Sequence, residues 1–133
     1  MTDLNAWFKA AGSGDEEALQ QLMNQGADVN AKDAGENTAL HLATKHGHKN
    51  IMHLLIAHGA DVNAQNDYLS TPLHLTERNM ESIRILLEAG ADPNMTDKDW
   101  NFPYYFAFYG AMSRELTELY IKHGANLMLY PDK

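Results

Sequence analysis

Seven histidines are the residues of this sequence with the clearest capacity for chemistry. Imidazole nitrogens bind zinc and transfer protons near neutral pH. His46 and His48 stand two residues apart, and His41 lies five before His46. This spacing matches no zinc-protease pattern, and no acidic ligand stands at helical spacing among the three. We therefore expect no metal and no cofactor, and a metal-binding or enzymatic protein that uses the histidines is the weaker alternative.

Two other patterns have the residue types of catalytic groups. Glu115 and Glu118 are three residues apart, but basic residues flank them, which is typical of a solvated helix face. The Gly-Ser-Gly segment at 12–14 lacks the rest of a phosphate loop or a nucleophile elbow, and we interpret it as a turn between helices. Because no nucleophile, base and orienting group can be named together, we predict that the protein is not an enzyme.

Length and charge narrow the class of partner. The chain has 133 residues, 44% of them hydrophobic, which suits one domain over residues 1–133. It contains no cysteine and no apolar run long enough for a membrane span. The formal charge of −8 repels nucleic acid and mildly favours a basic protein partner. We expect a cytoplasmic protein that is a monomer on its own, with no nucleic-acid and no membrane contact.

The sequence repeats itself. The phrase Gly-Ala-Asp-Val begins at Gly26 and Gly59 and returns in altered form at Gly90 and Gly124, at intervals of 33, 31 and 34 residues. A period of this length predicts a stack of similar supersecondary units, none of which can bury its apolar face alone. The predicted units cover about 1–31, 32–64, 65–95 and 96–133.

The second unit is the most regular. Thr38 is a suitable N-cap for a short helix that runs towards Gly47. A second helix follows, with apolar residues at i, i+3 and i+4 starting from Ile51. Gly59 stands where this helix must end in a left-handed conformation. Each unit is therefore expected to be a helix-turn-helix pair followed by a polar connector.

These residues carry a family resemblance that covers nearly the whole chain. Thr-Pro-Leu-His at 71–74, Gly-His at 47–48 and two copies of Gly-Ala-Asp-Val-Asn-Ala, ending at Ala31 and Ala64, resemble the pattern of ankyrin-repeat proteins. The resemblance implies an all-α solenoid of about four stacked helix-turn-helix units, with projecting β-hairpin loops and a concave face. It also implies that His41 and His74 bond neighbouring backbone and tie one loop to the next.

The same resemblance raises a modification. Some ankyrin repeats are substrates of an asparaginyl hydroxylase, and Asn30 and Asn63 occupy the matching position. The alternative is that both asparagines are structural and bond backbone groups in the turn after the second helix.

The chain also departs from the family pattern. The third unit is two residues short: the Gly-His turn between its helices is missing near Asn79 and Met80, so its two helices are expected to meet more tightly there. The family's hairpin glycine is replaced by Glu36, Leu69 and Trp100, although Gly35 could supply the conformation one position earlier in the first loop. The last unit has Phe-Pro-Tyr-Tyr at 102–105 and further aromatics up to Tyr109, some of which we expect to cap the stack.

The resemblance places partner contacts on loop tips and on the exposed ends of the first helices. The predicted contact residues are Glu36, Asn37, Tyr68, Leu69, Asp99 and Trp100 on the loops, and Lys45, His46, Arg78 and Tyr109 on the helices. The alternative for Leu69 and Trp100 is that they pack against adjacent loops. We predict a non-catalytic module that blocks or sequesters a protein, as an inhibitor or immunity-type protein does. The other candidate is a scaffold or adaptor that joins other proteins.

Overall fold

The computed structural model describes residues 3–105 and 114–126. All regular secondary structure in these residues is helical, and these residues contain no β-strand. In chain order they are α1 (Leu4–Ser13), α2 (Glu16–Asn24), α3 (Ala39–Lys45), α4 (Lys49–Ala57), the 3₁₀ helix η1 (Pro72–Leu75), α5 (Met80–Glu88) and α7 (Arg114–Lys122).

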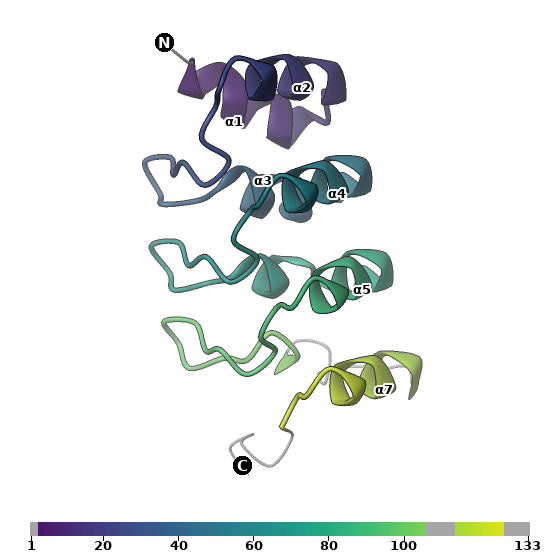
Figure 1. Ribbon diagram of the computed structural model, residues 1–133. Coiled ribbons are helices and arrows are strands. Elements are labelled where there is room, and N and C mark those ends of the chain that lie inside the picture. The colour runs from purple at the N-terminus through teal and green to yellow at the C-terminus, as the bar shows by residue number, and fades with distance from the viewer. Residues whose placement is uncertain (1–2, 106–113, 127–133) are drawn as a thin grey trace.

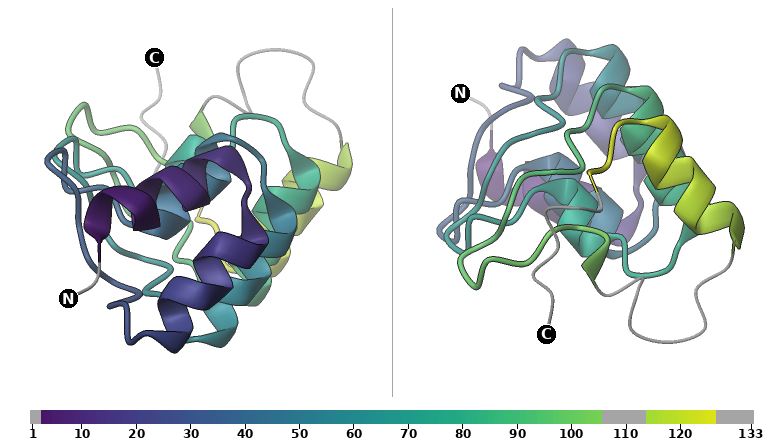
Figure 2. Two further views of the ribbon diagram at one scale, coloured as in Figure 1. Left: turned by 90° about the horizontal axis from the view of Figure 1, so that it is seen from above. Right: turned by 90° about the horizontal axis from the view of Figure 1, so that it is seen from below.

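The helices form a stack of antiparallel pairs, and the long loops between pairs all project to the same side (Figure 1). Within a pair, α1 packs on α2, α3 on α4 and η1 on α5. Between pairs, α1 packs on α3 and α3 on η1, while α4 packs on α5 and α5 on α7. Viewed along the stack, the loops gather at one edge and the second helices at the opposite side (Figure 2). The all-α solenoid expected from the repeat is confirmed.

Side-chain caps fix where these helices begin. In α3, the Thr38 hydroxyl accepts a hydrogen bond from the His41 N–H at 3.3 Å, as predicted for an N-cap. Asp15 and Asn79 do the same for α2 and α5. Just after the C-terminal end of α4, Gly59 has a φ of 91°. Glycine adopts this left-handed conformation at little steric cost, and it commonly ends helices.

The apolar core runs through the stack as one cluster. Each pair contributes fully covered side chains, such as Trp7 in the first, Leu40 and Leu55 in the second, and Leu73 and Leu86 in the third. Because every unit buries its apolar face against its neighbours, the stability of the stack depends on the interfaces between units.

The third unit is shorter than the second because its first helix is shorter. Instead of seven residues of α-helix, as in α3, it has the four-residue η1. Glu77, with a φ of 54°, then turns the chain back towards α5. Arg78 was predicted at the end of a helix, but it lies in this turn, outside both η1 and α5. That prediction was wrong because the shortening falls on the helix itself.

The fourth unit continues the core through aromatic rings. The Tyr104 ring is fully buried, stacks on Phe102 with ring centroids 5.3 Å apart, and meets the edge of Tyr120 at 5.6 Å. Burial raises the pKa of the Tyr120 phenol, and the side chain of Thr76 acts in the opposite direction. Tyr109 lies outside the described residues, as do the other aromatics predicted to cap the stack at 106 and 108.

Candidate protein-binding face

Three loop tips project beside one another, and we call them the first finger (33–37), the second finger (66–70) and the third finger (97–101). Each is built on one side chain. In the first finger, Asp33 Oδ1 accepts from the N–H groups of Gly35 and Asn37, at 2.9 Å each. Asn66 and Asp97 repeat this arrangement in the second and third fingers. This turn-forming role was not predicted from the sequence, although the three residues recur in the same register of the repeat.

The fingers hold a backbone conformation that normally requires glycine. Glu36, Leu69 and Trp100 have φ angles of 61°, 57° and 66°. The left-handed conformation is therefore kept at all three positions where the family glycine is replaced. Gly35 does not take it over, contrary to the suggestion from sequence, because Asp33 fixes the turn one residue later. For a non-glycine residue, the left-handed conformation is less favourable by roughly 1 kcal/mol or more in free energy.

Hydrogen bonds join each finger to the next. The Asp67 N–H donates to the Gly35 carbonyl at 3.0 Å, and the Lys98 N–H donates to the Tyr68 carbonyl at 2.7 Å. The fingers therefore form one layer, although the strand pairing of a β-hairpin does not occur in the residues described.

Two histidines, the buried His41 and the half-buried His74, fix the fingers from below. His41 Nε2 donates to the Ser70 carbonyl at 2.9 Å, while its Nδ1 accepts from the Thr38 N–H at 3.1 Å. His74 repeats the pattern, with Nε2 donating to the Asn101 carbonyl at 3.0 Å. Burial lowers the pKa of both imidazoles. The expected tie between neighbouring loops is therefore present, and it requires the neutral ring.

The second and third fingers expose large apolar side chains. Tyr68 is 69% exposed, Leu69 47% and Trp100 79%. Neither Leu69 nor Trp100 is therefore buried against an adjacent finger, the alternative considered from sequence. The Lys98 to Tyr68 hydrogen bond holds the two tips side by side. Glu36 and Asp99 are exposed at the neighbouring positions, and Asn37 is half-buried because it accepts a 2.9 Å hydrogen bond from Asn66.

The predicted contact residues on the helices lie apart from these tips. Lys45 is the last residue of α3, and His46 follows it as the C-cap. Both are exposed and, with Arg78, line an open recess of about 360 Å³ where α3 meets the shortened third unit. The recess exists because η1 ends earlier than α3.

A polar hollow of about 470 Å³ is lined by residues of the first two fingers and of the segments that lead to them. Glu36 lines it from the first finger and Leu69 from the second. Lys32 reaches across, and its ammonium group donates to the Gln65 carbonyl at 2.9 Å. The remaining lining residues are mainly acids and amides: Asn30, Asp61, Asn63 and Asn66.

The histidines do not gather into a metal site. No group of three or more His, Asp or Glu side chains that could hold a metal ion occurs within residues 3–105 and 114–126. His48 instead donates from Nε2 to the Gly12 carbonyl at 2.9 Å, which joins the first two units. His58, the C-cap residue that follows α4, has its Nδ1 2.9 Å from the Leu54 carbonyl.

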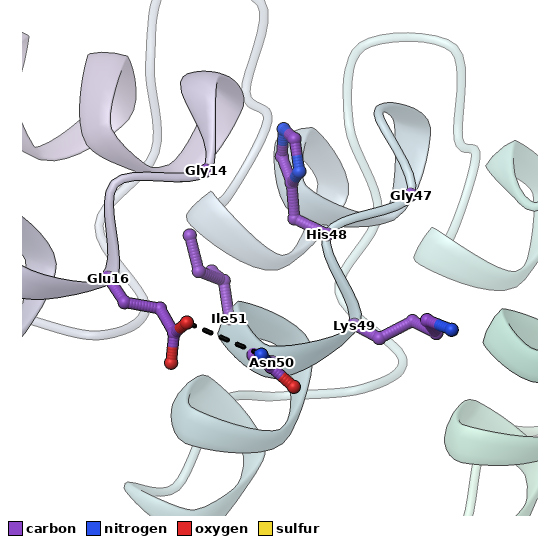
Figure 3. Close-up of a pocket in the computed structure, with 7 residues that line it drawn as sticks. All are labelled: Gly14, Glu16, Gly47, His48, Lys49, Asn50 and Ile51. Carbon is purple, nitrogen blue, oxygen red and sulfur yellow. Dashed lines mark hydrogen bonds between the residues drawn. The ribbon is translucent and has the colours of Figure 1, made fainter.

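Figure 3 shows a smaller hollow of about 250 Å³ on the side of the stack where paired helices connect. Glu16 points towards Asn50, whose amide donates to it at 3.4 Å. Lys49 points the other way, towards the third unit, and pairs with Glu81. These contacts link three successive units through exposed side chains, and such pairs contribute at most about 1 kcal/mol each.

The asparagines of the modification hypothesis have structural partners. Asn30 Oδ1 accepts from the Asp61 N–H at 2.8 Å, and its Nδ2 donates to the Gly59 carbonyl at 3.2 Å. Asn63 Oδ1 accepts from the Asp92 N–H at 2.8 Å. Each asparagine therefore bonds the backbone of the following unit, which favours the structural interpretation.

A regular stack of helix pairs with projecting loops defines a helical solenoid, a class that binds through extended surfaces. A family model for ankyrin repeats, in three copies, matches residues 7–97. The chain therefore belongs to the ankyrin-repeat family, whose members are generally protein-protein interaction modules. No curated protein matches the chain significantly. None of the helices described is long and apolar enough to cross a bilayer.

Proposed function

We propose that this protein is a non-catalytic module that binds a partner protein through its fingers and the neighbouring ends of its first helices. The single observation that carries the proposal concerns Leu69 and Trp100. Both hold a left-handed backbone that glycine would adopt at lower cost, and both expose their side chains. Inside the chain these side chains gain little, whereas a bound partner would cover them.

The residue types support the same conclusion. Trp and Tyr supply much of the binding energy when an interface covers them. Tyr68, Leu69 and Trp100 lie on adjacent fingers that are joined by a backbone hydrogen bond, so one partner surface can cover all three. The rigid finger layer means that little conformational entropy is lost on binding.

Masking is the simplest mode of action for such a surface. An inhibitor or immunity-type protein has only to occupy part of its target, whereas a scaffold must hold two partners at once. The formal charge of −8 and the acids on the fingers favour a basic target, because complementary charge accelerates encounter and selects partners.

The test compares the protein with two double variants as baits in an extract of its native source. L69A/W100A removes the finger side chains, and L4A/I121A removes two exposed apolar side chains far along the chain from the fingers. We expect one protein to be retained by the wild type and by L4A/I121A but not by L69A/W100A. With that protein purified, L69A/W100A should weaken the affinity by more than about 2 kcal/mol, roughly thirtyfold, at a nearly unchanged melting temperature.

Two results would count against the proposal. If L69A/W100A loses binding only in proportion to its folded fraction, these side chains are structural. If the retained protein forms a ternary complex with a second protein on this chain, and neither loses its own activity, the chain is a scaffold and masking is wrong.

A further inference from the structure

The seam between the first and second fingers carries acidic side chains that form no ion pair within the described residues. Glu36 and Asp67 are both exposed there, and the hydrogen bond from the Asp67 N–H to the Gly35 carbonyl brings their backbones together. In the described part of the chain, the ion pairs are Lys49 with Glu81 and Arg114 with Glu118, so neither finger acid is paired.

The polar hollow opens at this seam and is suited to a cation. Its walls present carboxylate and amide oxygens, with Glu36 and Asp61 as the two acids. The ammonium group of Lys32 is the one cation that lines it, and it already donates to a backbone carbonyl there. The hollow therefore accommodates an alkylammonium group and retains an excess of acid.

The apolar surface begins where the hollow ends. Leu69 lines the hollow and is also part of the exposed apolar group that continues through Tyr68 to Trp100 on the third finger. The fingers are stacked side by side (Figure 1), so the acids Glu36 and Asp67 lie at the first seam, and the apolar side chains continue from there to the third finger. Asp99 is a further exposed acid on the third finger, beside Trp100. A ligand lying along the fingers meets a negative site first and an apolar site next.

We infer that the fingers recognise a protein segment that carries a lysine or arginine within a few residues of a bulky apolar side chain. The cationic group enters the hollow beside Glu36, and the apolar side chain covers Leu69 and Trp100. This inference rests on the proposed function, because it names the chemistry that the same surface selects. It differs from a general preference for basic partners, since it requires charge at one place.

A random library of displayed twelve-residue peptides tests this chemistry without knowledge of the natural partner. It is selected on the wild type and on three variants. E36K/D67K reverses the charge of the seam, and neither side chain bonds another described residue through its carboxylate. E88K/E115K changes the net charge equally at exposed sites on α5 and α7. L69G/W100G removes the apolar side chains and relieves the backbone.

Selection on the wild type and on E88K/E115K should enrich peptides in which Lys or Arg lies near a bulky apolar residue. On E36K/D67K the basic residue should disappear from the enriched peptides while the apolar residue stays. A selected peptide should bind E36K/D67K about tenfold more weakly than the wild type, and E88K/E115K less than about threefold more weakly.

The outcomes separate the inference from the function beneath it. Enrichment that depends on Leu69 and Trp100 but lacks Lys or Arg overturns the inference alone. The same holds if Lys or Arg stays enriched on E36K/D67K, or if E88K/E115K loses it equally. Peptides that bind L69G/W100G as well as the wild type would overturn the proposed finger interface itself.

Discussion

His74 donates a hydrogen bond from Nε2 to the carbonyl of Asn101, the residue that follows Trp100, over 3.0 Å. A half-buried ring in the third unit thereby holds the tip of the third finger. His41 does the same for Ser70, the residue that follows Leu69. Leu69 and Trp100 are thus each one residue away from a carbonyl anchored by a histidine.

This arrangement predicts that the free energy of unfolding falls at mildly acidic pH. Burial lowers the pKa of His41 and His74 below the ordinary value of 6.5. Between the native pKa and pH 6.5, these histidines are therefore more protonated in the unfolded chain than in the native state. The stabilisation is complete above pH 6.5 and is lost as the pH falls towards the native pKa. Each histidine contributes a slope of at most about 1.4 kcal/mol per pH unit.

Urea denaturation between pH 7.5 and 5.5, above the range where ordinary carboxylates titrate, measures the slope. H74Q should reduce it, whereas H53Q, at an exposed site on α4, should leave it unchanged. Equal slopes in the wild type and in H74Q would mean that the His74 ring is not the group that titrates.

The left-handed residues of the fingers predict variants that are more stable than the wild type. L69G should raise the free energy of unfolding by about 0.5–1 kcal/mol, because glycine adopts a φ of 57° without steric cost and the lost side chain is half-exposed. L69A is the matched control, since it removes the same contacts but retains the Cβ. If L69A gains as much as L69G in urea denaturation, relief of the backbone is not the cause.

The repeat period was sufficient to predict much of the fold, because it placed both the caps and the apolar faces. Thr38 and Gly59 have the capping roles that their positions indicated. The conformation of the first finger could not be predicted in the same way. Propensity favoured Gly35 for the left-handed position, but two hydrogen bonds to Asp33 move it to Glu36.

The third unit shows a second limit. The two-residue gap was visible in the sequence and predicted a tighter turn between the helices, but a shorter first helix absorbs the same gap. The structure shortens the helix to η1, and this placed Arg78 in a turn and opened the recess beside Lys45. The exposure of the candidate binding residues likewise depends on how neighbouring fingers pack, which a single repeat does not encode.

Close packing between the first two units predicts different costs for two glycine substitutions. Gly14 and Gly26 have similar φ angles of 84° and 92°. A Cβ at Gly14 would lie 2.9 Å from the His48 ring, whereas at Gly26 nothing lies within 4 Å. G26A should therefore cost only the backbone term, about 1 kcal/mol, and G14A about 1–3 kcal/mol more.

The measurement is the free energy of unfolding of both variants in urea at neutral pH. The hydrogen bond from His48 to the Gly12 carbonyl should also break in G14A, so the His48 ring resonances should shift in NMR spectra. Identical losses of stability in G14A and G26A would show that the His48 ring can move aside at no cost in free energy. In that case the ring does not hold the two units together.

The side-chain hydrogen bonds of Asn30 and Asn63 predict that substitution by aspartate has different effects at these two positions. Asn30 both accepts from the Asp61 N–H and donates to the Gly59 carbonyl, whereas Asn63 accepts from the Asp92 N–H and makes no donor bond among the described residues. An aspartate can accept but cannot donate. N30D should therefore lose a hydrogen bond and set a carboxylate against a carbonyl, while N63D keeps its one bond.

We expect N30D to lower the free energy of unfolding by about 1 kcal/mol more than N63D, because a lost hydrogen bond with an unpaired acceptor costs that much. Urea denaturation at neutral pH compares the two, and repeating it below the pKa of the new carboxyl groups is the control. Protonation restores a donor, so the difference should shrink in acid relative to the wild type. A difference that is absent at neutral pH, or that grows on protonation, would mean that the Asn30 amide does not stabilise the junction between the units.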